Sequence, residues 1–282
     1  MQHGSDRRML LLSDQKPQTI SVLNLDKGKI VEEWTPKDID KVRDITPITK
    51  HEDMTDTPIV YGISDKQMIV LDERLPDKQG ASKEYASFVG FQSIGTSESG
   101  FIATGSTDGT IRMYDTIGKK AKTRLLGLGD NIRYLEVSND GKWILATCEE
   151  YILVIPTTIP GTDQTGFEGR GMPAKQRPRP YILRLKLADM EKLKLRKISF
   201  TPAHFDNGKD IEEQWIVSST GPYIIKWNFR KLKKAGIVND YFIRRANAKV
   251  VNNEFRFNHQ DDLLISETHN VYAQHSHKAQ SK

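Results

Sequence analysis

Lysine and arginine side chains give the clearest functional signal in this chain, and they gather in two segments. Residues 170–197 contain ten basic and two acidic residues, and residues 226–249 contain eight basic and one acidic residue. The whole chain of 282 residues has a formal charge of only +5, so these segments are strongly basic regions on an acidic remainder. If they adjoin in space, they form one positive face, which attracts acidic partners and speeds their encounter.

Exposed lysines and arginines of these segments, and of one lysine-rich turn, are the candidate partner-binding residues. They are Lys119, Lys120, Arg170, Arg177, Arg179, Arg244 and Arg245. The alternative interpretation is that the charges are solvated and keep a strand edge from pairing with other chains. For Arg245, a salt bridge that braces its own sheet is a further alternative.

Three kinds of acidic partner fit a positive face: an acidic protein or peptide segment, an anionic lipid surface, and RNA. Lipid surfaces attract clustered Lys and Arg by about 1 kcal/mol each. Single-stranded nucleic acid also needs aromatic side chains that stack on the bases, and Phe167, Tyr181 and Trp227 are the candidates near the charges. Two of these three fall in expected strands. Protein or peptide binding is therefore favoured, nucleic acid is disfavoured, and a membrane surface stays open.

Residues for catalysis, metal binding or cofactor binding form no recognisable pattern. His269, His275 and His277 cluster in the sequence, but two of them lie in a polar tail, and metal ligands must converge. Acidic pairs such as Glu149-Glu150 are sequence neighbours, which point to opposite faces of a strand. We expect no cofactor, no metal and no catalytic residue. The alternative is a hydrolase that brings several acidic residues or histidines into a central channel.

A repeated β-structure must position the basic segments. Residues 99–115, 139–155 and 213–227 each contain a short apolar strand, a polar turn and a second strand. Turns such as Thr107-Asp108-Gly109-Thr110 suit tight hairpins, because Asp and Gly accept positive φ at low cost. We therefore expect Asp108 and Asp140 to form turns. A hairpin that recurs at long, fairly even spacing is typical of a β-propeller.

The spacing of the hairpins predicts the blades. The first strands of the inner hairpins begin near Arg8, Pro58, Phe101, Lys142, Gln214 and Asp262. Blades of the WD-repeat type span about 40–45 residues, and the interval after the fourth hairpin is too long by about 25–30 residues against that period. Residues 158–180, rich in Gly, Pro and Thr, account for this excess as a basic surface insertion. We predict an all-β, WD-repeat-like β-propeller with six visible blade units, forming a single domain over residues 1–282.

The two ends and one intermediate segment add further expectations. Residues 8–34 contain three strand-like runs with no innermost strand before them, and the last blade also has three, followed by a disordered polar tail at 275–282. These open ends suggest a longer parent sequence, with seven blades as the alternative to six. Residues 181–197 show alternating and then helical spacing of Leu and Met, which indicates an outer strand followed by a short helical or irregular link.

The single cysteine and the hydropathy pattern indicate the compartment. Cys148 excludes an internal disulfide and falls in the expected strand Trp143–Cys148, where a small buried thiol packs as a hydrophobe. The chain has no run of 18 apolar residues and no apolar signal-peptide core near its start. Together these features favour a soluble protein of the cytoplasm or nucleus.

The repeats and the motifs between them resemble one known family. The motifs include Ile102-Ala103-Thr104-Gly105-Ser106, Leu126-Gly127-Leu128-Gly129-Asp130, Ser199-Phe200-Thr201-Pro202-Ala203, Ser219-Thr220-Gly221-Pro222-Tyr223 and Ile243-Arg244-Arg245. Over roughly residues 9–257 the chain resembles the C-terminal propeller domain of the fungal vacuolar import and degradation protein number twenty-seven and its plant relatives. The resemblance implies an intracellular protein whose propeller binds other proteins, linked to delivery of proteins to the vacuole, and an upstream half absent here. It implies no catalytic activity.

Overall fold

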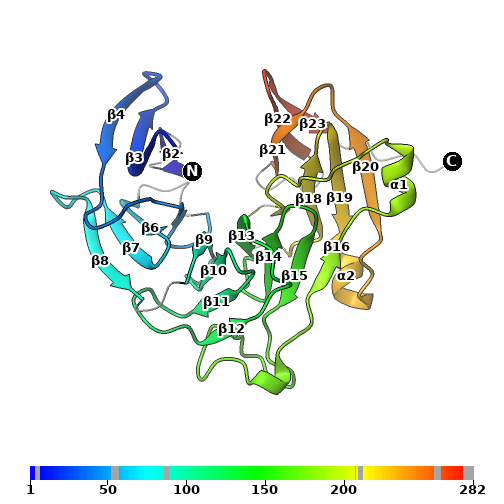
Figure 1. Cartoon of the computed structure of the whole chain (residues 1–282), viewed down its shortest axis with the longest axis horizontal. Coiled ribbons are helices and arrows are strands. Elements are labelled where there is room, and N and C mark those ends of the chain that lie inside the picture. The colour runs from blue at the N-terminus through cyan, green and yellow to red at the C-terminus, as the bar shows by residue number, and fades with distance from the viewer. Residues whose placement is uncertain are drawn as a thin grey trace. The chain divides into compact units, whose positions relative to one another are not determined.

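Six antiparallel sheets make up most of the chain. The structure, a computed structural model, describes residues 1–3, 7–51, 57–85, 89–206, 208, 212–256 and 262–275. Within these residues, the first five sheets have four strands each and the sixth has three (Figure 1). Consecutive strands are hydrogen-bonded neighbours in every sheet, so each sheet is a simple meander. The prediction of an all-β fold with six blade units is confirmed.

The strands follow one another in chain order. The first three sheets contain β1 (Gln2–His3), β2 (Arg8–Ser13), β3 (Lys16–Asn24), β4 (Lys29–Trp34), β5 (Asp44–Pro47), β6 (Ile59–Ile63), β7 (Gln67–Asp72), β8 (Gln79–Glu84), β9 (Phe91–Thr96), β10 (Ile102–Ser106), β11 (Ile111–Tyr114) and β12 (Thr123–Leu125). The other three contain β13 (Tyr134–Val137), β14 (Trp143–Thr147), β15 (Ile152–Pro156), β16 (Tyr181–Leu183), β17 (His204–Phe205), β18 (Trp215–Thr220), β19 (Tyr223–Asn228), β20 (Tyr241–Arg245), β21 (Val250–Phe255), β22 (Asp262–Glu267) and β23 (Val271–His275).

The six predicted hairpins are the ones that form, and their first strands begin within one residue of the predicted positions. The hairpin of β10 and β11 shows why the sequence folds locally in this way. Asp108 accepts hydrogen bonds from the backbone N–H and the hydroxyl of Thr110, both at 2.9 Å. Gly109 has φ of +77°, a conformation that L side chains rarely adopt. The prediction that Asp108 forms a turn is confirmed.

One strand-level expectation was wrong. The first sheet does not lack a strand, because β1 pairs antiparallel with β2 through Gln2↔Met9 and His3↔Arg8. It therefore has four strands, as the second sheet does. The ring of His3 is buried and meets the indole of Trp34 edge-on at 6.0 Å between centroids. This apolar contact, in addition to the short ladder, holds the two-residue strand in place.

The chain divides into two compact units, residues 1–143 with 157–178 and residues 144–156 with 179–282. In the first unit, Trp34 and Leu10 of the first sheet pack with Val60 and Leu71 of the second in one buried cluster. A bidentate ion pair joins the same two sheets, with Arg8 Nη1 and Nη2 donating to the carboxylate of Glu73 at 2.7 and 3.1 Å. The prediction of a single domain over residues 1–282 stays a prediction.

The second unit has its own core, formed mainly by the fifth and sixth sheets. Val217 and Ile224 of the fifth sheet pack with Phe255 and Ile265 of the sixth, and all four side chains are buried. Cys148 is also buried, at 1% exposed, which confirms the expected buried thiol. The sixth sheet ends with β23, and residues 276–282 of the predicted tail lie outside the described residues.

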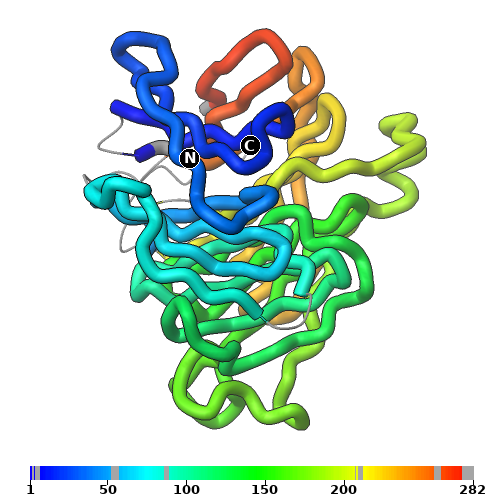
Figure 2. The backbone as a smooth tube through the Cα atoms, turned by 60° about the vertical axis from the view of Figure 1, so that its left-hand side comes forward, coloured from blue at the N-terminus to red at the C-terminus, as the bar shows by residue number. Residues whose placement is uncertain are grey.

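The basic insertion is anchored in its middle part, and the prediction of a surface insertion at residues 158–180 stays a prediction. Phe167 is fully buried and stacks on Phe101 with 5.2 Å between ring centroids. Thr123 of β12 donates its hydroxyl to Gly166 O at 2.6 Å and accepts from Met172 N at 2.8 Å. The segment appears as a light-green loop in Figure 2. Its apolar anchor was hidden because a single Phe has no periodicity.

Two short α-helices accompany the sheets. The expected outer strand within residues 181–197 is β16, and of the two alternatives for the link after it the helical one is observed, as α1 (Leu187–Lys192). The second helix, α2 (Phe229–Ala235), was not predicted. It begins where the side chain of Asn228 accepts a hydrogen bond from Lys231 N, and it ends at Gly236 in the left-handed conformation. In the part of the chain that the structure describes, no helix has the length and apolar character to cross a membrane.

Candidate functional site

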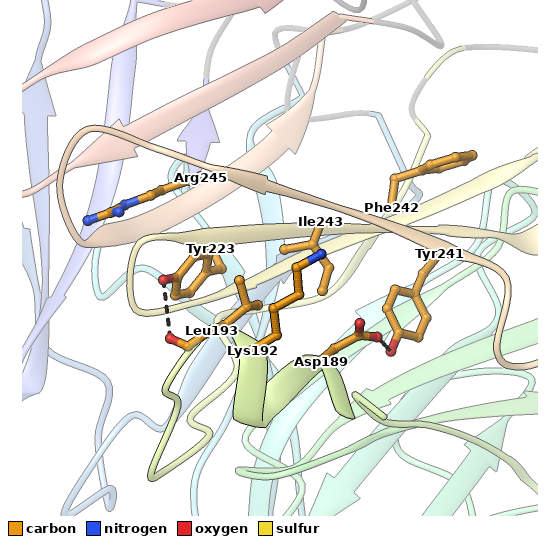
Figure 3. A pocket seen from close by; sticks show the side chains of 8 residues that line it. All are labelled: Asp189, Lys192, Leu193, Tyr223, Tyr241, Phe242, Ile243 and Arg245. Atoms are coloured by element: carbon orange, nitrogen blue, oxygen red, sulfur yellow. Dashed lines mark hydrogen bonds between the residues drawn. The ribbon is translucent and has the colours of Figure 1, made fainter. Parts of the chain in front are cut away.

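A cavity of about 550 Å³ lies in the second unit, next to the outer strand of the fifth sheet. Strand β20 and the α1 region provide most of its wall, with one further residue from β19 (Figure 3). The lining residues are Asp189, Lys192, Leu193, Tyr223, Tyr241, Phe242, Ile243 and Arg245. A volume of this size falls within the range of small-molecule and peptide side-chain pockets.

Local sequence signals position both walls of this cavity. β20 pairs with β19 along its whole length, from Trp227↔Tyr241 to Tyr223↔Arg245. The capped helix α2 connects the two strands and reverses the chain direction between them. The chain that forms the other wall leaves β16 at the buried Leu183. Helix α1 of this wall begins directly after Lys186. The two basic segments therefore meet at this cavity, because α1 lies within residues 170–197 and β20 lies within residues 226–249.

Tyrosine hydroxyls fasten the α1 region to the fifth sheet. The Tyr241 hydroxyl donates to Asp189 Oδ2 at 2.5 Å and accepts from Lys186 N at 2.8 Å. The Tyr223 hydroxyl donates to Leu193 O at 3.4 Å, and Figure 3 shows both tyrosines turned toward α1 and the residue that follows it. Burial, together with the nearby Asp189 carboxylate, raises the pKa of Tyr241 to about 12. The phenol therefore keeps its proton at neutral pH and remains a donor to Asp189.

The charges around the cavity are mainly positive. Asp189 is the only acidic residue of the lining, and its carboxylate accepts the Tyr241 hydroxyl. Lys192 and Arg245 line the cavity, and within the described residues neither forms an ion pair. Other lysines of this unit are neutralised, for example Lys197 by Glu149 and Lys231 by Asp240. The cavity thus presents cations that are available to an acidic ligand.

The predicted partner-binding residues are all exposed, and they divide between the two units. Arg179, Arg244 and Arg245 lie in the second unit, and Arg245 is the one that lines the cavity. Lys119, Lys120, Arg170 and Arg177 lie in the first unit. No ion pair involves any of the seven side chains among the described residues, so the alternative of a salt bridge for Arg245 is not observed there.

Within the first unit, the insertion brings two of the basic regions together. Met172 N donates to the Thr123 hydroxyl at 2.8 Å, which places Arg170 near the chain that follows Lys119 and Lys120. Lys119 O accepts a hydrogen bond from the Tyr85 hydroxyl at 3.0 Å, so the turn is fixed while its lysine side chains stay exposed. These exposed residues belong to the first unit, whereas the cavity lies in the second.

Side-chain clusters suited to metal binding are absent from the described part of the chain, where no group of three or more His, Cys, Asp or Glu residues could hold an ion. Burial raises the pKa of Asp44 to about 6, but its two carboxylate oxygens accept hydrogen bonds from Ile45 N and Ile94 N. That carboxylate therefore bridges backbone groups of two strands. His277 of the C-terminal histidine cluster lies outside the described residues.

Comparison with known proteins assigns the family. The sequence pattern of the VID27 C-terminal WD40-like domain matches residues 1–282. The chain belongs to this family. The resemblance found in the repeats is thus confirmed.

Two relatives carry the name vacuolar import and degradation protein 27. The protein of Saccharomyces cerevisiae is 34% identical over 277 residues, and that of Schizosaccharomyces pombe is 35% identical over 275 residues. Each comparison covers 94% of this chain but only 35% and 34% of the respective relative. The chain therefore spans about a third of the length of these proteins.

A solved structure shows the fold. The crystal structure of the β-propeller domain of Myceliophteria thermophila Cps50 (Swd1) matches this VID27-family chain with a TM-score of 0.66 at 12% identity, covering 98% of this chain and 82% of that one. At this identity the likeness concerns the fold alone. The prediction of a WD40-like β-propeller is confirmed.

Several cavity residues of this VID27-family domain were not singled out from the sequence. Lys192 fell within a basic segment but was not distinguished from its neighbours, and Asp189, Tyr241 and Phe242 carried no recognisable motif. Phe242 is a large apolar side chain that is 62% exposed. The available signal was the pattern Tyr-Phe-Ile-Arg-Arg itself, an aromatic and basic strand without an acidic residue.

Proposed function

We propose that this chain is a non-catalytic protein-interaction propeller that acts as a scaffold and recognises acidic segments of other proteins. The observation that carries the proposal is the group of exposed cations at β20, where Arg244 and Arg245 have no ion-pair partner among the described residues. They stand on a strand that pairs with β19 over five residues, so their backbone positions are fixed before a partner arrives. Fixed charges on a rigid element favour recognition, since little ordering is needed on binding.

The names of the relatives support a cellular context for this activity. Both are called vacuolar import and degradation proteins. We infer that the interactions of this domain serve intracellular protein trafficking or degradation to the vacuole, in the cytoplasm or nucleus. Charge steering would speed the encounter with an acidic partner, and the rate would fall as salt screens the charges.

Proximity labelling in cells tests the proposal. The test variant carries Arg244→Glu and Arg245→Glu, which reverses two exposed charges without touching the ladder to β19. A matched control carries Arg230→Glu and Lys234→Glu on α2, which makes the same change of net charge at exposed residues of the same unit that do not line the cavity. We expect the test variant to lose a group of labelled neighbours rich in acidic segments and the control to keep them.

The outcome separates a specific surface from a general charge effect. An unchanged neighbour set in the Arg244→Glu, Arg245→Glu variant would remove these residues from the interaction site. Equal losses in both variants would show that only the net charge matters, which also contradicts the proposal. Circular dichroism of the purified variants establishes that each one is folded before its neighbours are compared.

A further inference from the structure

The outer edge of β20 carries backbone groups that the fifth sheet does not use. In an antiparallel pair, every second residue exchanges hydrogen bonds with the partner strand, and the residues between point their N–H and C=O groups the other way. Ala246 N donates to Pro222 O at 2.8 Å, and Asn228 N donates to Asp240 O at 2.9 Å. The even-numbered residues of this ladder therefore face β19.

The odd-numbered residues of β20 consequently face outward. These are Tyr241, Ile243 and Arg245, which present three N–H and three C=O groups along the free edge. No described residue forms a backbone hydrogen bond with them at this edge. A row of unpaired backbone groups is a template on which another extended chain can add as a strand.

The cavity lies beside this same edge. Tyr241, Ile243 and Arg245 line it together with Lys192 and Leu193. Figure 3 shows Lys192 extending from α1 toward β20, and Phe242 projecting away from α1. A strand added at the edge would thus have the cavity on one face and the exposed ring of Phe242 near its other face, because side chains alternate along a strand.

We propose that an extended acidic segment of a partner protein binds as a fifth strand along β20, with its backbone paired to Tyr241, Ile243 and Arg245. This inference rests on the proposed function and gives it a binding mode. Acidic side chains on the cavity face of the added strand meet Lys192 and Arg245. The backbone pairing provides affinity that depends little on sequence, and the charges and the cavity select the segment.

Composition distinguishes β20 from the other outer strands and identifies the charge of the occupant. β20 contains two arginines and no acidic residue, whereas β4 contains two glutamates and β8 one. β12 and β16 have only three residues each, and β23 has no lysine or arginine. The chain's own residues 276–282, Ser-His-Lys-Ala-Gln-Ser-Lys, contain no acid and do not match the charge of the site. An acidic segment from another protein fits it.

A phage-displayed library of random dodecapeptides, selected on the folded domain, supplies the probe. We expect the enriched peptides to contain an excess of Asp and Glu and to lose affinity by about tenfold or more when Lys192→Glu and Arg245→Glu are combined. Synthetic versions of the best peptide, N-methylated at one residue at a time, then report backbone pairing. Methylation should abolish binding at alternate residues and leave it unchanged at the residues between.

Ile243→Pro tests the same pairing from the side of the protein. The substitution deletes an N–H that points away from the sheet, and proline is tolerated on edge strands in this orientation. Ile243→Val is the matched control, because it shortens the side chain but keeps the N–H. We expect Ile243→Pro to weaken the selected peptide by about tenfold or more and Ile243→Val to have little effect.

The remaining outcomes overturn the inference in distinguishable ways. If acidic peptides bind but tolerate N-methylation at every position and also Ile243→Pro, recognition occurs through side chains alone, and the proposed function survives without strand addition. If the library yields no acidic peptide, or if the Lys192→Glu, Arg245→Glu variant binds as tightly as the wild type, β20 is not the docking edge. Proximity labelling of the Arg244→Glu, Arg245→Glu variant tests the proposed function independently of these outcomes.

Discussion

The hydrogen bond between Tyr241 and Asp189 fastens α1 to β20, and Tyr241→Phe removes it with little change in shape. The mutation deletes the phenolic oxygen that donates to Asp189 Oδ2 at 2.5 Å and accepts from Lys186 N at 2.8 Å. A hydrogen bond to a charged group contributes about 1.5–3 kcal/mol. Because both side chains are partly exposed, water recovers some of this. We expect the free energy of unfolding to fall by about 1–2 kcal/mol near neutral pH.

The effect of Tyr241→Phe should depend on pH in a defined direction. Folding raises the pKa of Tyr241 from its ordinary 10.0 to about 12, because burial and the Asp189 carboxylate both oppose the phenolate. A raised folded-state pKa means that the folded protein holds the proton more tightly than the unfolded chain does. The stabilisation is therefore complete below pH 10 and is lost as the pH rises toward 12. The difference between wild type and Tyr241→Phe should shrink over that interval.

Urea unfolding near neutral pH and again at alkaline pH measures this difference, and hydrogen exchange over residues 187–193 reports whether the loss is local to α1. Tyr223→Phe is the control, because the Tyr223 hydroxyl lies 3.4 Å from Leu193 O, a weaker contact than that of Tyr241. We expect the control to lose no more than about 0.5 kcal/mol. Equal stability of Tyr241→Phe and wild type, or a difference that stays constant up to pH 12, would refute the reasoning.

Three further substitutions test how the chain is held together. Phe167→Ala should lower the free energy of unfolding, measured by denaturant titration, by about 3–5 kcal/mol, because a fully buried ring is lost. A loss below about 1 kcal/mol would contradict the anchoring of the insertion by this ring. Gly171→Ala should make residues 158–180 sensitive to limited proteolysis, because its Cβ would lie 2.0 Å from Lys122 O at φ of +72°. Gly118→Ala is the control, because it has a similar left-handed φ of +83° but its Cβ would meet no atom within 4 Å, and residues 158–180 should keep their protease resistance. Asn228→Ala should lower the free energy of unfolding by about 1 kcal/mol, because the α2 cap is lost, and Asn228→Ser should keep most of that stability. Thermal unfolding measures both variants, and equal stability of Asn228→Ala and Asn228→Ser would show that the cap is unimportant.

The blades were predictable because their signals are local. Hairpin turns such as Asp108-Gly109 combine an Asp that accepts nearby backbone hydrogen bonds with a Gly at positive φ, and both residue types can be recognised in a single sequence. The two-residue strand β1 could not be recognised in this way. Gln2 and His3 become a strand only through pairing with Met9 and Arg8, which no local pattern announces. Short strands of this kind depend on tertiary context rather than on propensity.

The candidate site was predictable in charge but not in shape. Arg244 and Arg245 stood out as basic residues of a family-like motif. The cavity beside them depends on Tyr241 and Asp189, which are 52 residues apart and meet through one side-chain hydrogen bond. The helix α2 could have been recognised, because an Asn cap and a terminal Gly frame a run of good helix formers. Its short length and the surrounding strands concealed it.

The burial of the single thiol gives this protein a practical advantage for biophysics. With Cys148 only 1% exposed, a maleimide dye added to the folded native protein should find almost nothing to react with. A cysteine introduced at an exposed position of the connection between β20 and β21, for example by Lys249→Cys, would then take up one fluorophore at one known place. Changes in its emission would report the arrival of a ligand directly, without a second mutation to silence background labelling.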